Sequence, residues 1–166
     1  MGVFIDYYQA IKTLIDNLRG GTATVQQLYD NQHIQLEHVH SVQHTYPTMD
    51  DSIVLTTGSG TKWTRGDFIE VVPANAITSP FDVHWMGIGA VSAVASVYEV
   101  ELYAGALGAE VEIGQCRAYR QAQQSGAAPS PMQTPINPAN TRISAKVACS
   151  VTTAETIAIA LFYHTY

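Results

Sequence analysis

Charged residues are scarce in this chain of 166 residues, because only 13% are Asp, Glu, Lys or Arg, and Lys and Arg together number 8. Typical soluble domains contain about 25% charged residues. Nucleic acids and anionic membranes are bound through clustered cations, so this composition, with its net charge of −6, argues against both partners. The low charge also indicates a surface partly covered by another chain, unless Ala, Thr, Ser and Gln supply its polarity instead.

Cysteine is also rare. Cys116 and Cys149 fall in separate expected strands and form no C-x-x-C pair, which excludes the usual zinc and redox motifs. A disulfide between them would require neighbouring strands with suitable geometry. We expect both to be reduced thiols in the core, where free cysteine behaves as a small hydrophobic residue.

Long apolar segments are missing as well. No run of 18 apolar residues exists that could cross a membrane. The first residues have neither the basic region nor the apolar segment of a signal peptide, and Asp6 stands where a myristoylation signal would have Ser or Thr. We therefore expect no membrane partner.

Catalytic motifs are lacking too. No Gly-x-Ser-x-Gly elbow is present. The segment Gly58-Ser59-Gly60 is too short to hold phosphate and leads into no helix, so we interpret it as a hairpin turn. A cupin-type metalloenzyme would need grouped histidines, but the expected β region has only His84 and His164, far apart and without a His-x-His pair. We expect no enzymatic activity, no catalytic residues and no cofactor.

Residues 3–18 are predicted to form a helix, which Gly20-Gly21 ends. Five apolar residues recur at the spacings 3, 4, 3 and 4 of a coiled-coil seam: Phe4, Tyr7, Ile11, Leu14 and Leu18. A helix of this length is marginal in water by itself. It therefore needs its own β domain, a second copy or a capsid subunit to pack against, and the five residues are candidate oligomer or capsid contacts.

A second helix is predicted over residues 24–44, ending before Tyr46-Pro47 because a residue before proline avoids the α region. Four polar residues would share one face of this helix: His33, Glu37, His40 and His44. His40 and His44 have a spacing that can hold zinc, but the Glu that follows the first His of a metalloprotease motif is missing. A metal site, a polar helix face and histidines packed near a subunit axis all remain alternatives.

From residue 51 onward the apolar period changes to two, as in half-buried strands. Strands are predicted over residues 53–57, 68–72, 81–86, 98–103, 110–119, 142–149 and 157–163. No helical pattern separates them, which favours a sandwich, and the jelly roll is the common form with eight strands. We therefore expect a mainly β protein: an antiparallel jelly-roll-like β-sandwich of about eight strands over residues 48–166, preceded by an N-terminal helical arm over residues 1–47.

Two segments of the β region have a distinctive composition. The polar stretch 121–140 contains four prolines, which predicts a connection rather than a central strand. In the final strand, Ala158, Ala160 and Phe162 make the second face apolar as well. We expect this strand to be paired on both sides.

The alternation also places acidic and aromatic side chains. Glu99 with Glu101, and Glu110 with Glu112, would lie on strand faces that bind Ca²⁺, pair with a basic partner or are simply solvated. We favour solvated faces. Trp63 and Trp85 are expected in the core rather than as platforms for carbohydrate.

Several segments resemble structural proteins of tailed bacteriophages, and the resemblance covers roughly residues 34–166. It is carried by Val71–Asn75, Ser79–Trp85, Thr134–Ser144 and Phe162–Tyr166, together with the lead-in before Tyr46-Pro47. The chain is similar to the jelly-roll cement, or decoration, proteins that sit as trimers on capsids. The resemblance implies a jelly roll, a binding role and a virion location.

On this resemblance, we expect a homotrimer on the capsid surface that binds the major capsid protein and stabilises the head by bridging capsid subunits. Similar β modules occur in tail and fibre proteins. The alternative is therefore a tail or fibre module that binds carbohydrate on the host surface, with Trp63 and the 121–140 stretch as contacts.

Overall fold

The computed structural model describes residues 12, 13, 15, 27, 42–48, 51–120 and 128–166, and the first four of these have helical backbone. The chain divides into two compact units, Met1–His40 and Ser41–Tyr166. Several residues of the expected arm lie outside the described residues: Phe4, Tyr7, Ile11, Leu14, Leu18, His33, Glu37 and His40. The helical arm therefore stays a prediction. No helix within the described residues is long and apolar enough to span a membrane.

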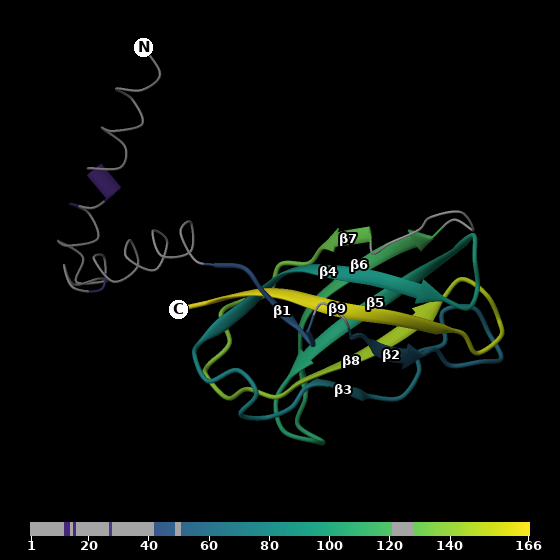
Figure 1. The fold of residues 1–166 in the computed structure, drawn as a ribbon, viewed down its shortest axis with the longest axis horizontal. Coiled ribbons are helices and arrows are strands. Elements are labelled where there is room, and N and C mark those ends of the chain that lie inside the picture. Colours follow the sequence, from purple (N-terminus) through teal and green to yellow (C-terminus); the bar gives the residue numbers. More distant parts are fainter. Residues whose placement is uncertain (1–11, 14, 16–26, 28–41, 49–50, 121–127) are drawn as a thin grey trace, which may run out of the picture. The chain divides into compact units, whose positions relative to one another are not determined.

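The second unit is a sandwich of two antiparallel sheets (Figure 1). Sheet A contains β1 (His44–Tyr46), β2 (Ile53–Thr56), β4 (Phe81–Val91), β7 (Ala128–Pro131) and β9 (Thr156–Thr165). Sheet B contains β3 (Ile69–Val72), β5 (Ser96–Ala104), β6 (Val111–Arg120) and β8 (Ile143–Cys149). The predicted mainly β sandwich is confirmed.

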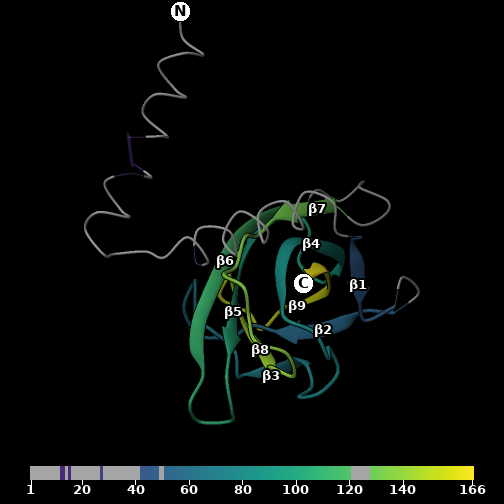
Figure 2. The ribbon, with the colours of Figure 1, turned by 90° about the vertical axis from the view of Figure 1, so that its left-hand side faces the viewer.

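The strand order is that of a jelly roll. Sheet A runs β1-β9-β4-β7, with β2 also on β9, and sheet B runs β3-β8-β5-β6. Pairs β1/β2 with β9, β3 with β8, β4 with β7 and β5 with β6 are nested along the chain, as in one long antiparallel ribbon. Rolling up that ribbon adds the contacts of β9 with β4 and of β8 with β5. In Figure 2, β5 and β6 of sheet B lie beside β4 and β9 of sheet A.

The core lies between the sheets and is built from the alternate residues that the strand pattern indicates. Residues with at most 2% exposure come from both sheets: Leu55, Val71, Phe81, Val83, Met86, Ile88, Tyr98, Val100, Leu102, Ile143, Val147, Ile157, Ile159 and Leu161. Burying each of the large apolar side chains contributes about 1.5–3 kcal/mol. Tyr98 keeps its hydroxyl satisfied by donating to the Ala93 carbonyl, at 3.2 Å.

The cysteines and the last strand confirm two predictions. Cys116 and Cys149 are free, buried thiols, and they lie on β6 and β8 with β5 between them. Burial raises the pKa of the Cys116 thiol to about 12. β9 pairs with β4 on one side and with β1 and β2 on the other, as its two apolar faces predict.

A β-bulge in β4 overturns the prediction for Trp85. Val83 pairs with Tyr163 and Trp85 pairs with Phe162, so His84 is an extra residue with no cross-strand partner of its own. A bulge shifts the alternation by one position. Met86 takes the buried place expected of Trp85, which is 42% exposed instead.

Three local predictions are wrong. Gly58-Ser59-Gly60 is not a hairpin turn, because the strands on either side, β2 and β3, belong to different sheets. The second helix does not reach residue 44, because His44–Tyr46 is a strand paired with β9, so the expected domain boundary at residue 47 lies after the first strand of sheet A. The 121–140 stretch is not only a connection, since Ala128–Pro131 forms an edge strand on β4. Proline is tolerated at that edge because no further strand needs its N–H.

Candidate functional site

The outward side of sheet A is almost free of charge. Directly opposed residues of antiparallel strands point to the same side, so partners can be followed across the sheet: Val54 with Ala158, Thr45 with Phe162, Gly87 with Ala160 and Pro129, and Trp85 with Phe162 and Pro131. We call these nine residues the A-face. The described strands of sheet A contain no Lys, Arg or Glu, and their one carboxylate, Asp82, is 4% exposed.

A pocket opens on the A-face beside Trp85. It has a volume of about 310 Å³ and is lined by Gln43, Trp85, Pro129 and Phe162. The Phe162 ring lies directly over Gly87, where an added Cβ would come within 2.9 Å of it. Trp and Phe are large, rigid contact groups, and protein interfaces are enriched in them. The A-face with its pocket can therefore take an apolar side chain of another protein.

The outward side of sheet B is different, because its carboxylates are paired within the chain. Arg65 donates from Nε to Glu101 Oε1 at 2.6 Å and also reaches Glu99 at 3.4 Å. Arg117 donates to the other Glu99 oxygen at 2.5 Å, and the Tyr103 hydroxyl donates to Glu101 at 2.6 Å. The expected solvated face is wrong for Glu101, which is 3% exposed.

These contacts shift the pKa values of Glu101 and Tyr103. The hydrogen bonds from Arg65 lower the pKa of Glu101 although burial acts in the opposite direction. Burial and the hydrogen bond to Glu101 raise the pKa of Tyr103 to about 12. The pair is therefore a carboxylate and a neutral phenol at neutral pH.

A second arginine pairs with two further carboxylates, Glu70 and Glu110. Arg142 donates to Glu70 at 2.7 Å and to Glu110 at 3.1 Å. Glu112 is exposed, as expected for a solvated face. Most of the carboxylates that were candidates for Ca²⁺ or a basic partner thus have an arginine partner in the same chain.

Trp63 lies on the β2–β3 connection and not in the core. It is 37% exposed, and the Arg117 guanidinium lies 5.1 Å from its ring centroid. Its φ of 65° is unusual for a bulky residue. A surface pocket of about 350 Å³ is lined by Glu99, Gln115, Cys116 and Arg117. The sequence pattern gave no indication that both tryptophans are on the surface.

The histidines also lie differently from the prediction. His44 belongs to β1, and its ring stacks on Tyr163 with centroids 5.3 Å apart. His44 is therefore not part of the expected helix, and His40 lies outside the described residues. His84 and His164, which are far apart in the sequence, are neighbours with ring centroids 4.4 Å apart. Only the pairing of β4 with β9 brings them together, and no local pattern encodes that pairing.

Comparison with known proteins adds little to the description of this chain. No family model and no curated protein matches the chain. Two solved structures are similar, each described as the structure of infectious bursal disease virus. The Gx strain structure has 13% identity and a TM-score of 0.40 over 75% of this chain and 32% of that chain. The Gt strain structure has 14% identity and a TM-score of 0.38 over 76% and 33%. The chain thus spans about a third of the chains that it matches, and we draw no functional conclusion from them.

Proposed function

We propose that this chain is a non-enzymatic virion structural protein of a tailed bacteriophage, acting as a capsid cement protein. In this role, a homotrimer on the capsid surface would bind the major capsid protein and bridge neighbouring subunits against the pressure of packaged DNA. The segments that resemble cement proteins support the proposal, as does the jelly-roll order of the strands. A nucleic-acid or membrane partner is not part of it.

The observation that carries the proposal is the A-face. In a sheet with one solvated face, each strand normally alternates apolar residues that point to the core with charged or polar residues that point to the solvent. Here the outside presents small and apolar side chains around the pocket of Trp85 and Phe162. We assign this face to contact with a capsid subunit.

Particles test the role directly. Virions that lack this chain should lose DNA or burst at a lower temperature than complete virions, because the bridges between capsid subunits are missing. The readout is DNA release during a temperature ramp, with added purified chain as the rescue. Equal heat resistance of the two particles would contradict a cement role.

A pair of surface variants tests the contact. Trp85→Glu places a charge in the A-face pocket and should weaken binding to chain-free particles at least about tenfold, as for a central interface residue. Val111→Glu is the matched control, since Val111 is 67% exposed on β6 in the other sheet and should bind normally. Both variants should keep the circular dichroism and thermal unfolding of the native chain. Normal binding by Trp85→Glu would remove the A-face from the proposal.

A second candidate function is the carbohydrate-binding tail or fibre module, and exposed Trp63 beside Arg117 favours it. An aromatic ring with an adjacent polar group is a common element of sugar sites. Trp63→Ala should then abolish binding to host cells without affecting particle stability.

Copy number separates the two candidates. A cement protein is present in amounts close to those of the major capsid protein, whereas a fibre protein is present in a handful of copies per particle. Quantitative mass spectrometry of purified virions measures this ratio. A ratio near one supports the cement protein, and a very low ratio supports the fibre module.

A further inference from the structure

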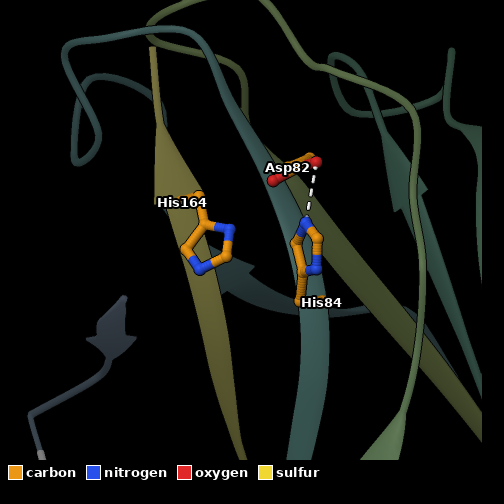
Figure 3. Close-up of side chains that lie close together, drawn as sticks. All are labelled: Asp82, His84 and His164. Atoms are coloured by element: carbon orange, nitrogen blue, oxygen red, sulfur yellow. Dashed lines mark hydrogen bonds and ion pairs between the residues drawn. The ribbon is translucent and has the colours of Figure 1, made fainter. Parts of the chain in front are cut away.

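One cluster of side chains has the composition of a metal site and has no part in the contacts proposed above. It contains Asp82 and His84 from β4 and His164 from β9 (Figure 3). We propose that these three residues bind a divalent transition metal ion, with Zn²⁺ as the ion that best fits the ligand set.

The geometry brings three donor groups to one point. One ligand atom from each residue lies within 4.8 Å of the others. His84 Nε2 is 3.0 Å from Asp82 Oδ2, and the two imidazole rings are tilted by 44° with centroids 4.4 Å apart. Zinc ligands at about 2.0–2.2 Å from the ion lie roughly 3.2–3.6 Å from one another. Small side-chain rotations therefore suffice, and the half-buried histidines have room for them.

The backbone holds the three residues in place. Asp82 and His164 are direct cross-strand partners, which puts their side chains on the same side of sheet A. His84 adds the third group, because it follows Asp82 by two residues and its Nε2 lies 3.0 Å from Asp82 Oδ2. It is also the residue of the β4 bulge that has no cross-strand partner. Bulges commonly aim a side chain at a functional site. All three ligands thus stand on strands in the interior of sheet A.

A residue behind the cluster orients the carboxylate. The Tyr166 hydroxyl donates to Asp82 Oδ2 at 3.0 Å, and the backbone N–H of Tyr166 donates to the Pro80 carbonyl at 2.9 Å. Ligating carboxylates in metal sites are typically fixed by such outer hydrogen bonds.

The donor set selects the class of ion. Two imidazoles and one carboxylate suit zinc and similar transition metals, whereas Ca²⁺ and Mg²⁺ require six or more oxygen ligands, including water. Three protein ligands leave a fourth position for water or for a residue of another subunit. The cluster lies on the outward side of sheet A, because the neighbours Phe81 and Val83 are buried. Its place differs from that of a cupin metal, which is held inside the barrel.

A bound ion would connect β4 and β9 near residue 164, in addition to the backbone pairing of the two strands. An ion that binds only the folded chain shifts the unfolding equilibrium toward it. The site therefore acts as a clamp on the end of β9, close to the A-face.

Metal titration of the full-length purified chain tests the proposal. After treatment with chelator and dialysis, Zn²⁺ alone should bind one equivalent per chain by calorimetry and raise the Tm. Co²⁺ should give the intense visible absorption of a four-coordinate site with nitrogen ligands. His164→Asn and, independently, His84→Asn should each weaken Zn²⁺ binding at least about tenfold.

Two controls locate the site. His44→Asn changes a histidine of the same sheet outside the cluster and should leave binding unchanged. A triple change of His33, His38 and His40 to Asn removes the remaining histidines of the chain and should also leave binding unchanged. The proposal is overturned if the native chain binds no Zn²⁺, or if the His84 and His164 variants bind it as tightly as the native chain.

Discussion

Glu101 is a carboxylate in an almost fully covered position, and its three hydrogen bonds decide its ionisation. Arg65 and Tyr103 both donate to it, and its pKa is lower than the ordinary 4.5 because of the bonds from Arg65. The folded chain therefore binds fewer protons here than the unfolded chain. The stability that Glu101 contributes is present above about pH 4.5 and is lost as the pH falls through the lower pKa of the folded state.

Glu101→Gln should lower the free energy of unfolding by about 1.5–3 kcal/mol at pH 7, the range for hydrogen bonds to charged groups. Urea unfolding at pH 7 and at pH 3.5 measures it, and the difference between variant and native chain should shrink at the lower pH. Glu112→Gln is the control on an exposed carboxylate. A loss as large in the control, or one that does not depend on pH, would contradict the role given to the Arg65 pair.

For single residues, the sequence predicts which side chains of a regular strand are buried. It does not predict where a bulge interrupts the alternation. Tyr98, Val100 and Leu102 are buried as expected. Trp85 is not, because one inserted residue reverses the side on which it lies. The pairing of Glu101 depends on an arginine 36 positions away, and no local pattern predicts that contact.

The β2–β3 connection carries the chain from sheet A to sheet B, and its two ends cross closely. The Gly58 N–H donates to the Thr64 carbonyl at 3.0 Å. A Cβ at Gly66 would lie 1.8 Å from the Thr56 carbonyl oxygen, which is backbone and cannot move aside as a side chain does. Gly66 is therefore required by close approach and not by turn geometry.

Gly66→Ala should destabilise the fold by about 3 kcal/mol or more, since over-packing against backbone forces the two chain segments apart. Thermal and urea unfolding of the variant measure the loss. Ser59→Ala, an exposed change in the same connection, should have little effect. Native-like stability of Gly66→Ala would show that the connection adapts without cost.

The helical arm is predicted from the sequence alone, and its role can be tested directly. Replacing Ile11 and Leu14 by Asp would bury two uncompensated charges in any interface that the seam makes, each costing several kcal/mol. If the arm joins subunits, light scattering should show loss of the trimer. If it docks on the capsid, the variant should remain trimeric but fail to bind particles. A variant that is trimeric and binds normally would contradict both roles.

The elements themselves were predictable where alternation is continuous, because burial of one side imposes a period of two on each strand. β3, β5, β8 and β9 follow their predicted ranges closely. β1 and β7 were missed, because His44 was assigned to the second helix and β7 contains two prolines. Which strand pairs with which is a property of the rolled ribbon, so the His84–His164 contact could not be predicted.

At the scale of the whole molecule, the sandwich should be independent of the N-terminal segment. All buried apolar residues described in its core lie between Leu55 and Leu161. A chain that starts at Val42 should therefore unfold in one cooperative transition, with a Tm close to that of the full chain. Calorimetry measures this, and light scattering of the same sample shows whether the trimer survives. A truncated chain without a cooperative transition would contradict the expected autonomy.

The central position of β9 in sheet A has a consequence for biosynthesis. β1, β2 and β4 all leave the ribosome well before residues 156–165, yet each of them pairs with that last segment. The β5–β6 hairpin can form early from adjacent sequence, whereas most of sheet A must wait for its final strand. The nascent polypeptide therefore carries open strand edges until β9 has been synthesised, and slow closure is expected of a fold with so many distant pairings.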